Sequence, residues 1–166
     1  MILPIYTEPQ PVLFKETERI AEITPEITQL IADMRETMHN AKGIGLAAPQ
    51  IGQSVALCVI EAQDEEGNGI PFTALINPRI TWKSKRSIEM MEACLSIPGV
   101  EGPVMRPDRV RVKATGADGK ELEIKAGGLL ARVLQHEIDH LHGKLFTSYV
   151  AKGRLGTWKQ PSYPQV

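Results

Sequence analysis

The chain of 166 residues lacks several features that mark whole classes of protein. No apolar run approaches the roughly 20 residues that a membrane-spanning helix needs, so we expect no membrane contact. Its 19 basic residues stand against 20 acidic ones, which gives a net charge of −1. This balance supplies no overall positive field, and we therefore expect no direct binding of nucleic acid.

The chain is also poor in cysteine, with only Cys58 and Cys94. They could form one disulfide at most, and a chain of this size can bury a sufficient core without it. We expect free thiols and an intracellular, reducing compartment. The N-terminal stretch MILPIYTEPQPVLFKE has neither the basic region nor the apolar region of a secretory signal, which agrees with this expectation.

What is present predicts one domain, 1–166, of the α+β class. Residues 24–40 carry apolar side chains at helical spacing, behind a threonine cap and a proline at the first helical position, and indicate an amphipathic N-terminal helix. Residues 127–143 predict a second helix that ends at a glycine. The tail, 151–166, is too rich in glycine and proline for a long helix and is expected to be irregular.

The middle of the chain is predicted to be β structure. Residues 55–62 and 73–81 are typical of strands, with a loop at 64–69 between them. Residues 109–126 alternate apolar and polar side chains on both sides of an Ala-Asp-Gly turn, the pattern of a hairpin with one buried face. We therefore expect small antiparallel or mixed β-sheets packed around the central helix at 127–143.

That helix contains the pattern HExxH within the stretch QHEIDHLHG. His136 and His140 lie four positions apart and point the same way, and Glu137 shares their side of the helix with apolar residues. Burying these three groups without partners would cost about 1–3 kcal/mol each. A divalent metal ion satisfies them, with the glutamate placed to contact a water at the ion.

A catalytic site of this kind needs a third protein ligand. No aspartate or glutamate follows Asp139, which excludes proteases of the thermolysin kind. Phe146 stands where the metzincin pattern requires a third histidine. His142, two positions after His140, faces nearly the opposite side of the helix and is predicted to be a surface residue. The third ligand must therefore come from upstream.

The upstream candidates are His39, Cys58, Cys94 or a carboxylate. Cys58 lies in the middle of a predicted strand, where a free cysteine is commonly a small buried hydrophobe. His39 ends a predicted helix, where a capping or surface histidine is usual. Cys94 lies in MEACLSIPG, on a predicted loop or strand edge that could approach the helix. Cys94 is therefore the favoured third ligand.

Three blocks of this sequence resemble the peptide deformylases: GIGLAAPQ (43–50), EACLS (92–96) and QHEIDH (135–140). The family patterns are G-x-G-x-A-A-x-Q, E-G-C-L-S and Q-H-E-x-D-H, and the similarity continues through ALINP, the RP pair and HLHGKLF to about residue 149. The resemblance implies that a metal is held by the cysteine of the middle block and the two histidines. These ligands are Cys94, His136 and His140. It favours Fe2+, with Zn2+, Ni2+ or Co2+ as alternatives.

The resemblance implies a hydrolase that removes the formyl group from the N-terminal formyl-methionine of nascent polypeptides and releases formate. Glu137 would accept a proton from the attacking water and pass it to the departing amine. The side chain of Gln50 and the backbone N–H of Leu95 would donate to the oxyanion.

Substrate contacts are expected on both sides of this site. Gly43 and Gly45 fit a segment that a substrate backbone approaches closely, and Ala93 would lie beside the substrate as well. The methionine side chain would enter an apolar pocket lined by Ile44, Leu129 and Val133, although each of the three also fits an ordinary core position. Arg132 is expected at the rim of this pocket.

Ala93 replaces a glycine of the family pattern. If the position requires a positive φ, alanine costs about 1 kcal/mol; if it requires only space, the methyl group changes substrate affinity. The alternatives are therefore a deformylase-like metallo-amidase with another substrate or weak activity, and a binding protein without catalysis. Glu137 and Gln50 argue against the second.

The resemblance also implies partners and a location. The N-formylmethionyl nascent peptide is the expected partner, together with a transient contact with the ribosome. The long C-terminal helix that many bacterial relatives use on the ribosome is not recognisable in 151–166, which weakens that route. We expect a bacterial cytoplasm rather than an organelle reached by a transit peptide that has been removed.

Overall fold

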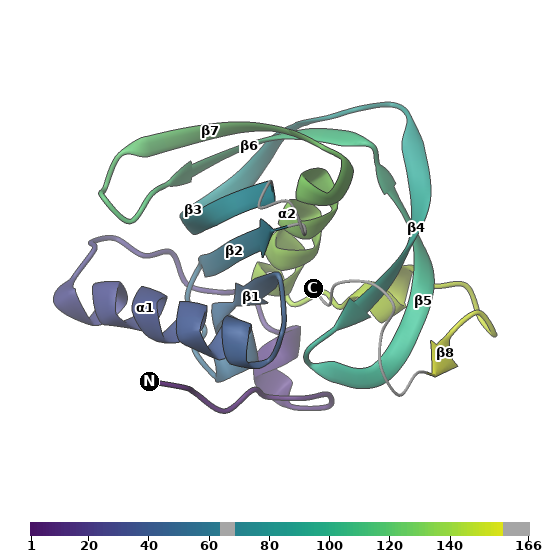
Figure 1. The fold of residues 1–166 in the computed structure, drawn as a ribbon, viewed down its shortest axis with the longest axis horizontal. Coiled ribbons are helices and arrows are strands. Elements are labelled where there is room, and N and C mark those ends of the chain that lie inside the picture. The colour runs from purple at the N-terminus through teal and green to yellow at the C-terminus, as the bar shows by residue number, and fades with distance from the viewer. Residues whose placement is uncertain (64–68, 158–166) are drawn as a thin grey trace.

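The fold is built around a central helix, α2 (Gly128–Leu141), that lies between two β-sheets (Figure 1). The computed structural model describes residues 1–63 and 69–157. Five strands form the larger sheet in the order β1-β2-β3-β6-β7, and three form the smaller sheet in the order β4-β5-β8. The α+β class and the central position of the HExxH helix are as predicted.

All strand pairs in the two sheets of the described residues are antiparallel. The larger sheet consists of β1 (Gly45–Ala47), β2 (Leu57–Gln63), β3 (Gly69–Lys83), β6 (Arg109–Thr115) and β7 (Glu121–Gly127). The smaller sheet consists of β4 (Ser87–Cys94), β5 (Ile97–Pro107) and β8 (Gly156–Thr157). The described residues also form three short 3-10 helices: η1 (Pro11–Phe14), η2 (Ala48–Ile51) and η3 (Phe146–Tyr149).

The amphipathic helix predicted at 24–40 is confirmed as α1 (Pro25–Asn40). The hydroxyl oxygen of Thr24 accepts a hydrogen bond from the backbone N–H of Ile27 at 3.4 Å, which caps the first turn. The buried side of α1, with Met34 and Met38, packs against β1 and β2. Burial of these methionines removes apolar surface from water and holds the helix on the sheet.

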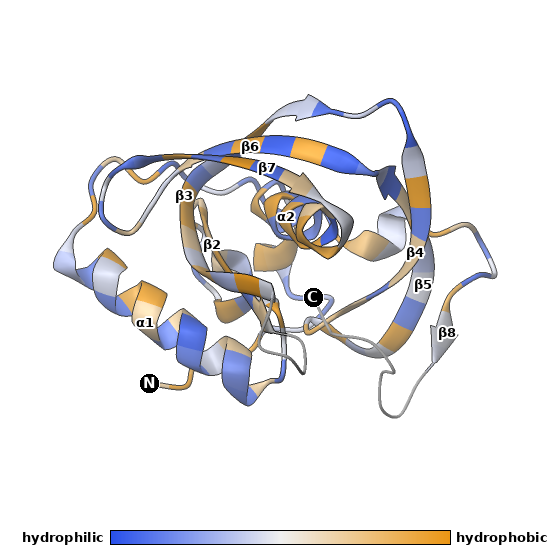
Figure 2. Cartoon of the chain, turned by 45° about the horizontal axis from the view of Figure 1, so that its top comes forward, coloured by the Kyte–Doolittle hydropathy of each residue, from blue (hydrophilic) through white to orange (hydrophobic). Residues whose placement is uncertain are grey.

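The alternation of side chains along β2 explains why the larger sheet has two covered faces at this edge. Leu57 and Val59 belong to the same apolar cluster as α1, whereas Cys58 and Ile60 belong to the cluster that packs on α2. Successive side chains of a strand point to opposite faces, so both faces of β2 are buried. Figure 2 shows α2 almost end-on, with the sheet curving around it.

Apolar and polar residues also alternate along β6, as predicted for the hairpin at 109–126 (Figure 2). Val110, Val112 and Ala114 are buried in the α2 cluster. Their neighbours Arg109 and Arg111 are exposed, on the face that turns away from α2. The contacts of α1 are mainly with β1 and β2, and its Arg35 lies over the ring of Phe72 on β3, so that helix covers the opposite edge of the sheet.

The long hairpin of β4 and β5 is the largest element that the sequence patterns do not predict. Cys94, expected on a loop or strand edge, is the last residue of β4 and is followed by a tight turn. The strand β5 contains three prolines and two glycines, IPGVEGPVMRP, and such residues argue against a strand when the sequence is considered alone. Pairing with β4 at Ile97 and from Glu101 to Pro107, with a register shift between them, overrides this local preference.

The segments expected to be irregular are described only in part. The loop expected at 64–69 lies outside the described residues except for Gly69, which begins β3. In the tail, 151–155 is irregular with a turn at 152–153, and 156–157 form the short strand β8, which pairs with Val100 and Glu101 of β5. Residues 158–166 lie outside the described part of the chain. Among the described helices, none is long and apolar enough to cross a membrane.

Gly143, the glycine predicted to end the second helix, follows α2 in a left-handed backbone conformation and packs closely against Phe14. Gly143 has φ +69°, and a Cβ atom there would lie 2.6 Å from the backbone carbonyl carbon of Phe14. We expect Gly143→Ala to lower the free energy of unfolding by at least about 2 kcal/mol, because the left-handed backbone alone costs roughly 1–2 kcal/mol. Urea denaturation followed by circular dichroism measures this loss.

The matched control for that change is Gly153→Ala. Gly153 has φ +82°, but no atom lies within 4 Å of the position of its added Cβ. This variant should therefore show only the backbone cost, about 1 kcal/mol. Equal losses at the two glycines would contradict a role for the Phe14 contact.

Candidate active site

Three ligand atoms from two elements converge in the interior of the molecule. Cys94, at the end of β4, and His136 and His140, on successive turns of α2, offer ligand atoms that all lie within 4.8 Å of one another. The Sγ atom of Cys94 is 3.3 Å from Nε2 of His140, which is 3.2 Å from Nε2 of His136. All three side chains are buried. The structure thus brings together the three residues chosen as metal ligands.

The donor set and its surroundings fit a divalent metal ion. One thiolate and two imidazoles are ligands that Zn2+ and Fe2+ accept. Burial raises the pKa of the Cys94 thiol and lowers the pKa of His140, so both are neutral unless a cation lies beside them. Neutral imidazole is the form that binds metal, and a cation would stabilise the thiolate.

Glu137 places a carboxylate at this group without any compensating contact. Its side chain is fully buried, and both carboxylate oxygens are without a hydrogen-bond partner among the described residues. Burial raises the pKa of this carboxyl well above its ordinary value. A buried carboxylate left unpaired is costly, so its presence indicates a functional rather than a structural role.

The comparisons with known proteins agree with this geometry. A family model described as polypeptide deformylase matches residues 2–155. The chain is 44% identical to the peptide deformylase of Salinibacter ruber, over 97% of this chain and 87% of that relative. It is 48% identical to the peptide deformylase of Thermodesulfovibrio yellowstonii, over 90% of each.

The chain belongs to the polypeptide deformylase family.

Solved structures of the family show the same fold. The peptide deformylase of Synechococcus elongatus, in complex with actinonin, has a TM-score of 0.85 at 40% identity, covering 91% of this chain and 80% of that one. The peptide deformylase of Ehrlichia chaffeensis has a TM-score of 0.86 at 38% identity, covering 92% and 89%. The chain is therefore a metal-dependent hydrolase of the deformylase family.

In this deformylase fold, Gln50 is buried in η2 with its amide group beside Cys94. Its Oε1 accepts a hydrogen bond from the backbone N–H of Ala47 at 2.8 Å. Its Nε2 donates to Oγ of Ser96 at 3.2 Å and lies 3.6 Å from Sγ of Cys94. The bond from Ala47 fixes the orientation of the amide, so that its N–H groups face the ligand group.

Leu95 follows the ligand candidate Cys94 in the chain, and Gly45 lies against the side chain of Glu137. The side chain of Leu95 is part of the apolar core around α1, so only its backbone could serve the site. At Gly45, an added Cβ would overlap Oε1 of Glu137 and lie 2.8 Å from its Cδ. The close approach that was expected at Gly45 from a substrate is thus already made by the side chain of Glu137.

The residues predicted for the apolar pocket do not share one environment. Ile44, which directly precedes β1, and Val133, which lies in α2, are buried in the same core cluster. Leu129, in the first turn of α2, is 38% exposed.

Ala93 is buried in β4 opposite Glu101. Positive φ values occur at only two non-glycine residues of the described chain, and Ala93 is not one of them, so the backbone strain considered for this alanine does not arise.

Glu92 is the main site residue that the sequence patterns missed. This fully buried carboxylate accepts a hydrogen bond from Nδ1 of His136 at 2.8 Å. Because an ionised carboxylate can only accept, Nδ1 carries the proton and Nε2 is left free to bind metal. Burial alone would raise the pKa of Glu92, but its hydrogen bonds with His136 and Arg106 hold that pKa well below its usual value.

Two buried arginines complete the surroundings of Glu92. Arg106 donates to it through Nε at 2.6 Å and Nη2 at 2.9 Å, and also donates to Asp139 at 2.7 Å. Arg132 donates to Glu92 at 2.8 Å and to the backbone oxygens of Val104 and Ile88. The expectation that Arg132 lies at a pocket rim is wrong, because its side chain is 4% exposed and joins α2 to both strands of the hairpin.

The residues set aside as ligands lie away from the group. His39 is exposed and bonds with Glu61 at 2.7 Å. His142 is exposed and bonds with Glu16 at 2.6 Å. Cys58 is buried in β2 as a core residue, where burial raises the pKa of its thiol. The sequence held one signal for the role of Glu92: it lies two positions before Cys94 in the EACLS block.

The first prediction from this site concerns Glu92. Replacing Glu92 with glutamine removes the charge that pairs with two buried guanidinium groups and orients His136. We expect metal affinity to fall by about 10- to 100-fold and the free energy of unfolding to fall by roughly 3 kcal/mol. Competition with a chelator and urea denaturation measure the two losses.

Glu89→Gln is the matched control, because Glu89 is an exposed carboxylate of the same strand that pairs with Arg154. It should change metal affinity little and stability by less than about 1 kcal/mol. A Glu92→Gln protein with unchanged metal affinity would show that this carboxylate does not support the ligand group.

The second prediction concerns Gly45. We expect Gly45→Ala to lower kcat by about 100-fold or more, since a displacement of about 1 Å in a reacting group has an effect of that size. Metal content should stay the same, because the overlap is with Glu137 and not with the three ligands. Steady-state kinetics and metal analysis of the purified variant give both values.

A double variant tests whether Gly45 acts through Glu137. If it does, adding Gly45→Ala to Glu137→Gln should cause little further loss of kcat. Additive losses in kcat would mean that the alanine acts on the substrate instead.

Proposed function

We propose that this chain removes the formyl group from the N-terminal formyl-methionine of nascent polypeptides, with Glu137 as the general base. The observation that carries the proposal is the buried, unpartnered carboxylate of Glu137 beside Cys94, His136 and His140. Membership of the deformylase family supplies the reaction class, hydrolysis of a linear amide. The metallo-amidase with weak activity is not favoured, because Ala93 carries no backbone strain.

Cys94, His136 and His140 would hold the metal ion. Fe2+ is the proposed occupant, with Zn2+, Ni2+ or Co2+ as alternatives that the same donor set accepts. The thiolate donates more charge than a third imidazole would, and oxidation of this ligand is the expected cause of inactivation in air. When bound, the ion acts as a Lewis acid that polarises the formyl oxygen and makes the attacking water more acidic.

Glu137 would move the proton. Its ionised carboxylate accepts a proton from the attacking water, and the resulting carboxylic acid delivers that proton to the departing amine. The raised pKa of this buried group suits both steps, because the ionised form is a stronger base than an exposed glutamate. Gly45 leaves the space in which the carboxylate lies.

Gln50 and Leu95 would stabilise the negative charge that develops on the formyl oxygen. The amide oxygen of Gln50 accepts from the backbone N–H of Ala47, which turns Nε2 toward the ligand group. One N–H of Nε2 donates to Ser96, and the N–H directed at Cys94 is the one that would donate to the formyl oxygen. The backbone N–H of Leu95 follows Cys94 directly in the turn after β4. Donors fixed in this way cost little reorganisation when charge develops.

We also propose how the substrate lies in this site. Ile44, Leu129 and Val133 would line the pocket for the methionine side chain, with Gly45 and Ala93 beside the peptide backbone. We propose that 1–166 acts as one catalytic domain in a bacterial cytoplasm. A transient contact with the ribosome stays a prediction.

The third prediction tests the reaction directly. We expect Glu137→Gln to lower kcat/KM for formate release from a formyl-Met peptide by about 100- to 10,000-fold, the usual contribution of a general base. Metal content should be retained, since Glu137 is not a ligand in this proposal. Anaerobically purified protein reconstituted with Fe2+ or Ni2+ is the right starting material for the assay.

The matching acetyl-Met peptide separates deformylation from a broader amidase activity. Efficient release of acetate as well as formate would support the broader amidase activity. Full activity of the Glu137→Gln protein would exclude the proposed role of this carboxylate.

A further inference from the structure

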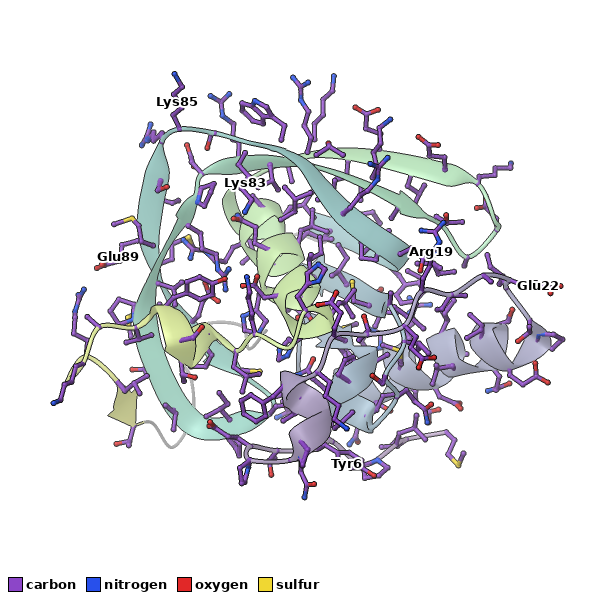
Figure 3. The ribbon with its side chains drawn as sticks, turned by 180° about the vertical axis from the view of Figure 1, so that it is seen from behind. Tyr6, Arg19, Glu22, Lys83, Lys85 and Glu89 are labelled. Carbon is purple, nitrogen blue, oxygen red and sulfur yellow. The ribbon has the colours of Figure 1, made fainter. Side chains whose placement is uncertain are left out.

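The outer face of β3, β6 and β7 carries exposed cations around one exposed tryptophan. We define the Trp82 face as Trp82, Arg109, Arg111 and Lys125, all of which are exposed. This is the side of the sheet that turns away from α2, and α1 packs mainly on β1 and β2, reaching β3 at Phe72, ten residues before Trp82. Figure 3 shows Lys85 projecting from the connection that follows β3, with Lys83 labelled at the end of that strand.

The strand register sets the centre of this face. Trp82 of β3 pairs with Arg111 of β6, and Arg111 pairs with Lys125 of β7. The guanidinium carbon of Arg111 lies 5.3 Å from the centre of the Trp82 ring. Neighbouring strands are about 4.8 Å apart, so the ring and two cations form one continuous row.

Among the described residues, the cations of this row form no ion pair, in contrast to those around them. Lys113 lies 3.5 Å from Glu121, and Arg86 lies 3.8 Å from Asp108. Within the described chain, no ion pair is formed by the side chains of Arg109, Arg111 or Lys125.

Like charges directly opposite each other in a sheet are destabilising, so the Arg111 and Lys125 pair costs the fold stability. An anionic partner would offset that cost.

The same residues surround a hollow in the surface. A cavity of about 260 Å³ is lined by Trp82, Arg109, Arg111 and Lys125, together with Val110, Ala126 and Gly127. Gly127 pairs with Arg109 and has no side chain, which leaves space beside that arginine. The hollow therefore offers a planar apolar surface and three cations to one ligand.

We propose that the Trp82 face binds single-stranded RNA. Sequence-independent binding of single strands combines cations that follow the phosphates with an aromatic ring on which a base stacks. Trp82 would provide the ring, and Arg109, Arg111 and Lys125 would contact phosphates. A single tryptophan among cations offers no apolar area for insertion into lipid, and an acidic peptide has no need of the ring.

This inference departs from the expectation drawn from net charge. A net charge of −1 describes the sum over the chain, whereas binding depends on the local field. The inference goes beyond the proposed function and does not depend on it. It would give a deformylase a means of staying near the RNA-rich particle from which formylated chains emerge.

The test is binding of a labelled polyuridine RNA to the metal-loaded full chain, followed by fluorescence anisotropy at several salt concentrations. We expect the logarithm of the affinity to fall linearly with that of the salt concentration, with a slope of about −0.7 for each phosphate contacted. Arg111→Glu with Lys125→Glu should weaken binding by about tenfold or more at low salt and reduce the slope. Trp82→Ala should weaken it roughly fivefold and leave the slope unchanged.

The charge-matched control is Lys15→Glu with Lys144→Glu, two exposed lysines on the side of the molecule near η1. It should leave RNA binding close to wild type. All three variants should release formate from a short formyl-Met peptide at the wild-type rate, which separates this test from the proposed function.

Several results would overturn the inference. One is that the wild-type protein shows no salt-dependent RNA binding. Another is that Lys15→Glu with Lys144→Glu weakens binding as much as Arg111→Glu with Lys125→Glu. A third is that polyglutamate binds as tightly as RNA and that Trp82→Ala has no effect. The last result would mark a general polyanion surface. Thermal melting of each variant shows whether the fold is intact.

Discussion

The charge pairing at Glu92 is the interaction on which the ligand group depends. The three metal-ligand candidates come from two elements, the end of β4 and the helix α2, and neither element alone can form the group. Glu92 is hydrogen-bonded to His136 and Arg132 on the helix and to Arg106 on β5. A buried carboxylate with these partners permits one arrangement of helix and hairpin, because displacing any of them leaves a charge without compensation.

A second constraint acts where β1 runs beside Glu137 of α2. The absence of a side chain at Gly45 lets the carboxylate lie against the strand, and the strand in turn keeps it from turning away. Polar partners thus hold His136, while close packing without polar partners holds Glu137. The ligand is thereby fixed in one tautomer, and the base keeps both oxygens free for water and substrate.

Much of the fold and the ligand group could be predicted from the sequence, for local reasons. Periodicity is a property of neighbouring residues, so both helices and the hairpin at 109–126 were recognisable. Cys94 could be chosen by elimination because no acidic residue follows Asp139. The hairpin of β4 and β5 could not be predicted, because its strand pairing overcomes the local preference of the prolines and glycines in β5. Arg132 was wrongly predicted at a pocket rim, because a helical projection gives the direction of a side chain but not the strands that it meets there. Net charge likewise said nothing about where on the surface the cations lie.

The place of α2 in the chain has a consequence for the order in which the molecule can assemble. The inner face of the larger sheet is covered by this helix, yet every strand of that sheet precedes it in the sequence. While the chain is being synthesised, the strands from residue 45 to residue 127 exist before the element that buries their apolar side. His136 and His140 lie on the same helix, so the ligand group cannot form before α2 has been made. An enzyme proposed to act on unfinished chains would thus bury the inner face of its own larger sheet, and gain its own activity, only after every strand of that sheet has been synthesised.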